Sequence, residues 1–479
     1  MTDMSEQRPA EICGILANLR SLMVAVVTLV LTAPPRYAQG DLPPRSFSVH
    51  QAVTFSLSHH PSLKARAAIE SMRAAQTTQA NMAMLPRLDL GAQWSRATGN
   101  VVVGTVFALP GMPAVSGPPL PAQFDGGVFG SSVSLSTGFD LAGLPQRMSQ
   151  LDVALAEQSQ AQAGTEVQKL DVAYMAADSY LQVWAAMAIV QAALASVERA
   201  KILTTMAESY QRAELRPGAD VSRARAELSL AEVQHSRAKQ SAAVAQMQLA
   251  QALGIAGATV EIMPMNIAVL PAEPASNPAH LVHPVLRESQ RAVQVAESQL
   301  RATRMQYLPR LELVAALWSR GSGLGPSSVA GGLIPDVANW GVGLVLSWPI
   351  LESFAVRARV QTAMAKQTLI IAQQEETTQA IRTQVDAARA TLTAAHAVLE
   401  HTPSALQAAR ATEQQALARY KAGLVRILDV ADAQRLLAQT ETEDALARIN
   451  ILRARLLLAR SLGDLSLFLD AQQTVKGIN

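Results

Sequence analysis

Four short segments of the chain alternate between apolar residues and small or polar residues. In the clearest one, every second residue from Trp340 to Trp348 is apolar, and most of the residues between them are glycine or serine. A period of two with one apolar face indicates a β-strand. The pattern predicts strands at residues 87–101, 128–141, 310–320 and 339–351.

Two other stretches predict very long helices. Residues 144–214 and 353–421 contain no strong helix breaker except Pro403, which predicts a kink or an interruption. A helix of about 70 residues is on the order of 100 Å long. Between Val221 and Ala252, apolar and small residues recur at steps of three and four. That spacing is typical of a coiled-coil seam in which helices approach closely.

The chain is a tandem duplication. His60-Pro61 recurs as His283-Pro284, and Leu85-Pro86 recurs as Leu308-Pro309 at the same spacing. In the second part of each half, Asp220 recurs as Asp429. Each half therefore reads as helix, two strands, very long helix, tight turn and helix.

The duplication also gives the expected domain organisation. The expected parts are a first repeat at 39–254, an inter-repeat linker at 255–280, a second repeat at 281–463 and a C-terminal tail at 464–479. One match between the repeats is out of step, because Trp94-Ser95-Arg96 recurs as Trp318-Ser319-Arg320, one position later than the Leu-Pro spacing requires.

The N-terminal segment predicts export. An apolar run from Leu22 to Thr32 follows Arg20, which predicts a signal peptide over residues 1–38. The only cysteine, Cys13, precedes that run, so we expect no lipid anchor and no disulfide within one chain. The formal net charge of +2, with both signs interspersed along helices, predicts no nucleic-acid partner.

Candidate chemistry is sparse. The histidines His59, His60 and His283 suggest a metal site at first sight, but the matched position of His60 and His283 before a proline favours a helix-start role. The sequence shows no nucleophile–base constellation, phosphate-binding glycine loop or zinc motif. We therefore expect no catalysis, no cofactor and no metal.

The strands predict contact with outer-membrane lipid. Trp340 and Trp348 lie on one face, about 26 Å apart at ~3.3 Å per residue. Together with Trp94 they would form the aromatic girdles that bound the apolar band of a membrane barrel. The opposite face is largely glycine and serine, which suits a water-filled lumen. A soluble sandwich with its apolar faces turned inward is the alternative.

Four strands cannot close a barrel alone, and open strand edges cannot face lipid. Two chains would give eight strands, whose interior is filled by side chains. Three chains would give twelve strands and an aqueous bore. The smallest conducting assembly is therefore a homotrimer.

The sequence resembles the TolC family of outer-membrane efflux proteins over nearly its whole mature length. The matching motifs are the two His-Pro-x-Leu and Leu-Pro-x-Leu pairs, Ser347-Trp348-Pro349, Tyr420-x-x-Gly423 and Asp429-Val430-x-x-Ala433-Gln434. The resemblance implies a mainly α protein with a transmembrane β part: a trimeric twelve-stranded barrel continued by an α-helical tunnel across the periplasm of a Gram-negative cell. It also implies a periplasmic adaptor and an inner-membrane pump as partners, in tripartite efflux or type I secretion.

The same resemblance implies that the two tight turns form a periplasmic gate. The family's gate Tyr and two Asp residues fall on Tyr420, Asp429 and Asp432, whereas the family's Arg position holds Val425, with Arg426 next to it. In a trimer the two carboxylates would form stacked rings that favour cations. N-capping of the following helix is the other reading of Asp429.

The first turn differs from the second. It carries Pro217 and Gly218 close to Asp220, which suits helix capping, and Ala213 stands where Gly423 sits in the duplicate. These turn residues are the expected adaptor contacts. Two rival functions are a periplasmic adaptor, which would carry a single hairpin, and a coiled-coil scaffold, which would not require strands bounded by tryptophan.

Overall fold

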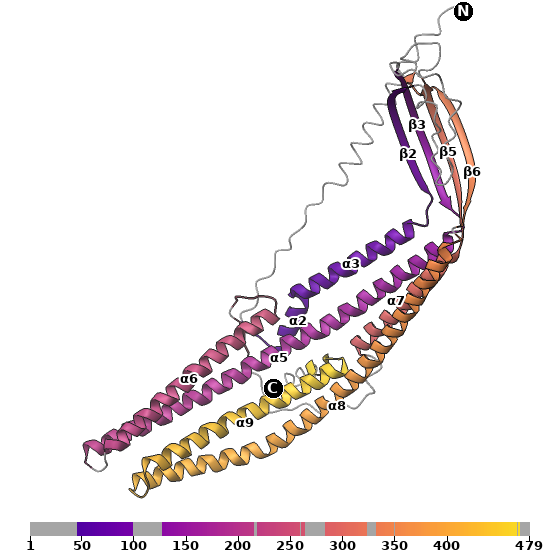
Figure 1. Ribbon diagram of the computed structural model, residues 1–479. Coiled ribbons are helices and arrows are strands. Elements are labelled where there is room, and N and C mark those ends of the chain that lie inside the picture. The colour runs from indigo at the N-terminus through magenta and orange to yellow at the C-terminus, as the bar shows by residue number, and fades with distance from the viewer. Residues whose placement is uncertain are drawn as a thin grey trace, which may run out of the picture. The chain divides into compact units, whose positions relative to one another are not determined.

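The computed structural model describes residues 46–98, 127–214, 218–258, 260–263, 283–322, 332–348, 350–466 and 468–469. The expected signal peptide, the turn residue Pro217 and most of the inter-repeat linker lie outside these residues. The described part of the chain consists of a four-stranded sheet, a small two-stranded sheet, two long helical hairpins and shorter helices beside them (Figure 1).

The sheet is antiparallel and has the strand order β2-β3-β5-β6. Its strands are β2 (Arg87–Thr98), β3 (Gly127–Asp140), β5 (Arg310–Ser322) and β6 (Val337–Ser347). Each repeat supplies one hairpin, and β3 pairs with β5 where the repeats meet. Strand β6 ends four residues before the predicted end at 351, because Pro349 has no N–H to donate to a ladder. Strands β2 and β6 form the two edges of this sheet.

A second, two-stranded sheet was not foreseen from the sequence. Strand β1 (Ser46–Phe47) pairs in parallel with β4 (Glu261–Ile262), which lies in the predicted linker. The Tyr180 hydroxyl donates to the Met263 carbonyl at 2.8 Å, and burial raises the pKa of Tyr180 to about 12. The start of the linker is therefore held against the helices.

Two helical hairpins make up most of the chain. Helix α5 (Leu144–Arg212) lies beside α6 (Gly218–Ala252), and α8 (Glu352–Lys421) lies beside α9 (Ile427–Leu462), as Figure 1 shows. The 69 residues of α5 correspond to about 100 Å of helix. The shorter helices are α2 (Val49–His59), α3 (Pro61–Met82) and α7 (Pro284–Arg304), followed by the 3-10 turn η2 (Met305–Tyr307).

Helix α8 shows that one of the two outcomes predicted for Pro403, an interruption of the helix, is wrong. It runs through Pro403 without an interruption. Proline at this position removes the N–H that would bond to the Leu399 carbonyl. The Thr402 hydroxyl donates to that carbonyl at 3.4 Å instead. The backbone acceptor therefore has a partner, and the helix continues.

Ion pairs join the two repeats along α5 and α9. Arg453 bonds to Asp178 at 2.8 Å and Arg460 bonds to Asp171 at 3.0 Å, one heptad apart on each helix. Within the described residues, α5 is the single helix that is long and apolar enough to cross a membrane. Helix α5 also packs against α2, α3, α6, α7 and α9.

The histidine–proline motif starts a helix in both repeats, which confirms the helix-start role. The His60 Nδ1 accepts the Ser62 N–H at 3.3 Å, and the His283 Nδ1 accepts the Val285 N–H at 3.2 Å. Each proline occupies the first turn of its helix. The imidazoles are therefore N-caps.

Protonation of the buried cap is expected to weaken the fold. Burial lowers the pKa of His283 from 6.5, and its Nε2–H donates to the Arg460 carbonyl, so Nδ1 must stay unprotonated to accept the Val285 N–H. Nearby, Arg460 opposes protonation of His283 and Asp171 favours it. Because the unfolded chain binds this proton at higher pH, the contribution is complete above pH ~6.5 and is lost as pH falls through the folded pKa.

The expected loss is about 1 kcal/mol, the usual contribution of an N-cap. Thermal unfolding of the wild type and His283→Asn, followed between pH ~7.5 and ~5, measures it. Asparagine caps without titrating, so the variant should show a shallower decline of melting temperature on acidification. Equal slopes for the two proteins would contradict the assignment.

A left-handed glycine closes each repeat onto its own His-Pro motif. Gly254 and Gly463 have φ of +78° and +82°. A Cβ on Gly463 would lie 2.8 Å from Pro284 Cδ and 3.0 Å from His283 Cα. The equivalent atom on Gly254 would lie 3.0 Å from Pro61 Cδ. Only glycine allows this backbone conformation and this close approach together.

We expect Gly463→Ala to destabilise the protein more than Gly257→Ala. Gly257 has φ of +89° with nothing within 4 Å of a built Cβ, so its alanine variant carries only backbone strain, about 1–2 kcal/mol. The alanine at 463 adds an overpacking cost of about 1–3 kcal/mol. Circular dichroism melts in detergent give the comparison. Equal losses of melting temperature would show that the close contact with His283-Pro284 adds nothing to the cost of the substitution.

Candidate functional site

The ends of the two hairpins meet within one chain. Seven buried residues from α5, α6, the end of α8 and the start of α9 form one apolar cluster there: Leu203, Ala207, Val221, Ala224, Tyr420, Ile427 and Val430. We call this set the tip cluster. It packs the connection of each hairpin against the other, so their separation requires apolar surface to be exposed to water.

Tyr420 is the largest side chain of the tip cluster. It belongs to the last turn of α8 and is fully buried. Its hydroxyl donates to Asp220 Oδ2 at 3.4 Å, and its ring lies 6.0 Å from the ring of Tyr210. Asp220 sits in the first turn of α6, so this bond crosses from one repeat to the other. The structure therefore brings together Tyr420 and Asp220, two residues that the sequence analysis selected in different repeats.

Asp429 supports the start of α9. Its carboxylate accepts the backbone N–H of Arg426 at 2.9 Å, and Arg426 is the residue that precedes the helix. This interaction agrees with the capping role that the sequence analysis considered for Asp429. Asp429 lies in the first turn of α9, however, and not at the cap position itself. The interaction fixes where α9 begins.

Asp432 is part of an ionic network that links the hairpins. Its side chain is 60% exposed and lies 3.4 Å from Arg435 Nη1. Arg435 also pairs with Glu227 of α6, which in turn accepts from Arg223 at 3.1 Å. The side chain of Glu227 is only 12% exposed. We call these four residues the inter-hairpin network.

The Arg435–Glu227 pair was missed from the sequence. Its partners come from different repeats, and spacing along the chain does not show which residues face each other. In the register that aligns Asp220 with Asp429, Glu227 and Arg435 are not at equivalent positions, so the duplication gave no signal for their contact.

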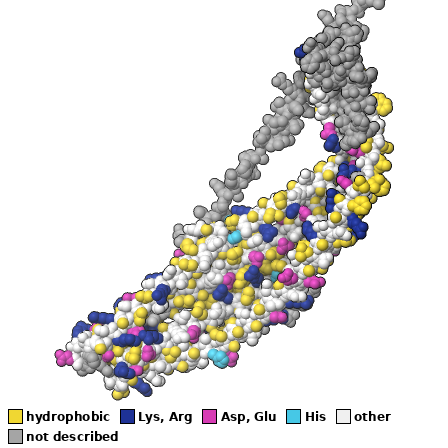
Figure 2. Space-filling view, viewed as in Figure 1, with side chains coloured by type: hydrophobic (Ala, Val, Ile, Leu, Met, Phe, Trp, Pro, Cys, Tyr) yellow, Lys and Arg dark blue, Asp and Glu magenta, His cyan; other side chains and the backbone are white. Residues whose placement is uncertain are grey.

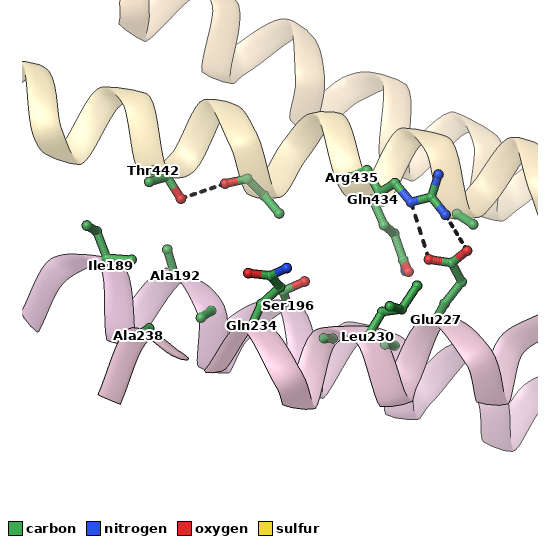
Figure 3. A pocket seen from close by; sticks show the side chains of 15 residues that line it. Ile189, Ala192, Ser196, Glu227, Leu230, Gln234, Ala238, Gln434, Arg435 and Thr442 are labelled. Atoms are coloured by element: carbon green, nitrogen blue, oxygen red, sulfur yellow. Dashed lines mark hydrogen bonds and ion pairs between the residues drawn. The ribbon is translucent and has the colours of Figure 1, made fainter. Parts of the chain in front are cut away.

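A cleft of about 520 Å³ separates the hairpins beside this network (Figure 3). It lies between α5, α6 and α9, and the Glu227–Arg435 pair stands at one end. Alanine is the most common residue in its lining: Ala192, Ala193, Ala200, Ala231, Ala238, Ala431 and Ala438. The cleft therefore leaves space between α6 and α9 beside the ion pair.

The two tight turns use different residues for the same conformation. Gly423 has φ of +83°, and Glu214 has φ of +57°. Glu214, and not Ala213, therefore stands in the place of Gly423, which corrects the correspondence drawn from the sequence. The second turn exposes Leu424, 74% accessible. In the first turn, Gly218 begins α6.

The expected aromatic girdle residues are exposed in the isolated chain. Trp94, Trp340 and Trp348 are 61%, 75% and 62% accessible, and Trp348 lies one residue beyond β6. The Trp94 Nε1–H donates to the Leu333 carbonyl in the connection between β5 and β6 at 3.3 Å. Figure 2 shows hydrophobic side chains where β6 leads into α8, and charged ones over the hairpin ends.

Comparison with known proteins identifies the protein family that this sequence matches. The model of the family described as outer membrane efflux protein matches residues 54–255 and 277–464. No curated protein matches the sequence significantly.

Several solved structures share the fold. The outer-membrane channel OprN is 22% identical with a TM-score of 0.73, covering 87% of this chain and 89% of its own. CusC is 17% identical with a TM-score of 0.75, covering 90% and 97%. The CmeC outer membrane channel of Campylobacter jejuni is 15% identical with a TM-score of 0.74, covering 90% and 88%. At these identities the likeness shows the fold.

Proposed function

The chain belongs to the outer membrane efflux protein family, and from that premise we propose that three copies close one water-filled barrel through the outer membrane. The resemblance drawn from the sequence is confirmed, and so are the efflux function and the outer-membrane location. The family consists of channels and not of enzymes. The adaptor and scaffold alternatives are not favoured.

The open sheet is the observation that carries the proposal. Leu88, Leu90, Leu344 and Leu346 are 65–76% accessible on one face, which would be costly in water. The edge strands β2 and β6 run antiparallel to each other in the strand order. Pairing β6 of one copy with β2 of the next removes both edges, and three copies give twelve strands.

The helical hairpins would continue this barrel as a tunnel into the periplasm. Their ends expose Leu424 and carry charged side chains, and they would meet the adaptor protein that connects the channel to an inner-membrane pump. The tip cluster and the inter-hairpin network would hold the entrance narrow. This assignment gives Tyr420, Asp220, Asp429, Asp432 and Arg426 places at the entrance.

The oligomer is tested by native mass spectrometry in detergent, followed by planar-bilayer recording of the same sample. We expect a trimer mass and single-channel current steps. A second test introduces cysteines along β2 and β6, with Cys13 replaced by serine, and oxidises them. Cross-linked trimers should form in one antiparallel register. A monomer that conducts nothing would overturn the proposal.

The charge at the entrance gives a separate prediction. If three Asp432 carboxylates ring the bore, Asp432→Ala or Asp432→Asn should lower the preference for cations over anions, because the ring attracts cations. The reversal potential in a salt gradient measures this preference. Asp386→Asn, which removes an exposed carboxylate of α8 far from the tips, is the matched control. Unchanged reversal potentials in the Asp432 variants would count against the ring.

A further inference from the structure

The duplicated tryptophans lie on opposite faces of the sheet. Trp94 shares its face with Leu90, and the strand pairing aligns Leu90 with Leu135, Leu317 and Trp340. Trp318 differs from Leu317 by one position, so it points to the other face. The sheet therefore uses the same Trp-Ser-Arg sequence on both of its sides.

The cause is one extra residue in β5. The spacing between the repeats is longer by one position at Trp-Ser-Arg than at the preceding Leu-Pro motif. A β-bulge would accommodate the extra residue and return the residues after it to the face that their counterparts occupy in β2. The ladders of β5 with β3 and β6 pair without a skip over the described residues. The shift by one residue therefore reverses the face of everything after it.

Trp318 has polar and small neighbours on its face. It lies opposite Ser134 on β3 and Asn339 on β6. Arg320 follows on the same face and lies between Ser132 on β3 and the apolar Val337 on β6. Trp318 and Arg320 are both partly buried. Both lie toward the end of β5 that is remote from α7, about 27 Å beyond Arg310 in the case of Trp318.

We propose that Trp318 and Arg320 line the outer mouth of the pore and bind aromatic anions there. The inference rests on the proposed three-copy barrel, which would place three indoles and three guanidiniums around one bore. An indole stacks on an aromatic ring, and a guanidinium bonds a carboxylate or sulfonate through two N–H groups. Ser134 and Asn339 supply hydrogen bonds beside them. An aromatic ring that carries a negative charge satisfies all of these groups.

The face of Trp318 is tested by fluorescence quenching in vesicles. The chain has 5 tryptophans, which are removed one at a time by Trp→Phe. Brominated lipid should quench a larger fraction of the emission of Trp318→Phe than of the wild type, and a smaller fraction of the emission of Trp340→Phe. Aqueous iodide should give the reverse order. Quenching of Trp318 by brominated lipid would overturn the proposal.

The ligand class is tested by current block with 2-naphthalenesulfonate, with methanesulfonate as the non-aromatic probe. We expect 2-naphthalenesulfonate to block the wild type, and Trp318→Ala to raise the half-blocking concentration about tenfold. Arg320→Gln should raise it similarly, whereas Trp94→Ala, the matched tryptophan on the apolar face, should leave it unchanged.

The outcomes separate the two proposals. A wild type that yields no current steps contradicts the three-copy barrel. A wild type that conducts but is blocked equally before and after Trp318→Ala contradicts the aromatic-anion site alone. Equal block by methanesulfonate and 2-naphthalenesulfonate would likewise remove the aromatic part of the proposal.

Discussion

Replacing Tyr420 by alanine is expected to separate the ends of the two hairpins. Tyr420 is fully buried in the tip cluster, and truncating a buried aromatic side chain costs about 3–5 kcal/mol. Tyr420→Phe keeps the ring and removes the hydroxyl that bonds to Asp220, a change worth about 1 kcal/mol. The alanine variant should therefore loosen the tips far more than the phenylalanine variant does.

Limited proteolysis measures this loosening directly. Lys421 is the last residue of α8 and directly follows Tyr420, so trypsin cleavage there reports the opening of the second hairpin's end. We expect Tyr420→Ala to be cut much faster than the wild type and Tyr420→Phe to be cut slightly faster. Leu424→Ala, at an exposed position of the turn after α8, is the control and should behave as the wild type. Cleavage of Tyr420→Ala at the wild-type rate would show that the tip cluster does not hold the hairpins.

The same variant should change the channel if the tips form its entrance. Larger single-channel conductance in Tyr420→Ala, with little change in Tyr420→Phe, is the expected result in planar bilayers. Faster proteolysis without a change in conductance would separate the two roles. The tip cluster would then stabilise the hairpin ends without restricting the bore.

The local parts of the fold were predictable because their signals are local. Alternation in β6 and the three-and-four spacing in α6 each reflect which side of one element is apolar, and a short window of sequence contains that information. The His-Pro helix starts were predictable for the same reason, since a cap involves residues only two apart. Pro403 shows the limit of such rules. The sequence shows that Pro403 lacks an N–H, but it does not show that the Thr402 hydroxyl bonds to the carbonyl left without that N–H.

The contacts of the candidate site were less predictable because they join the repeats. Tyr420 and Asp220 are 200 residues apart, and their bond depends on how two hairpins pack. The family resemblance pointed to Tyr420, Asp429 and Asp432, but it did not give Asp220 as the acceptor of the tyrosine hydroxyl. The face of the sheet on which Trp318 lies was predictable only in part. The one-residue shift is visible in the sequence, whereas the absence of a bulge in the described ladders required the strand pairing.

Neutralising Glu227 is expected to weaken the link between α6 and α9. Glu227 accepts from both Arg223 and Arg435, and its side chain is largely buried. Glu227→Gln leaves two guanidiniums close together without the carboxylate between them, at a cost of about 1–3 kcal/mol for charged hydrogen bonds. A cost of about 1.4 kcal/mol shifts an open-to-closed ratio about tenfold. The control is Glu208→Gln, which makes the same charge change but breaks a pair with Arg225 inside one hairpin.

The link is measured by spin labels placed on α6 and α9 on either side of the cleft, read as distance distributions in detergent. Glu227→Gln should broaden the distribution and lengthen its mean, and Glu208→Gln should not. Single-channel recordings of both variants should show more frequent or longer openings only for Glu227→Gln. The ionic network and the tip cluster both oppose this movement, and Glu227→Gln weakens the first of them alone. Identical distance distributions in the wild type and Glu227→Gln would mean that the tip cluster alone holds the hairpins together.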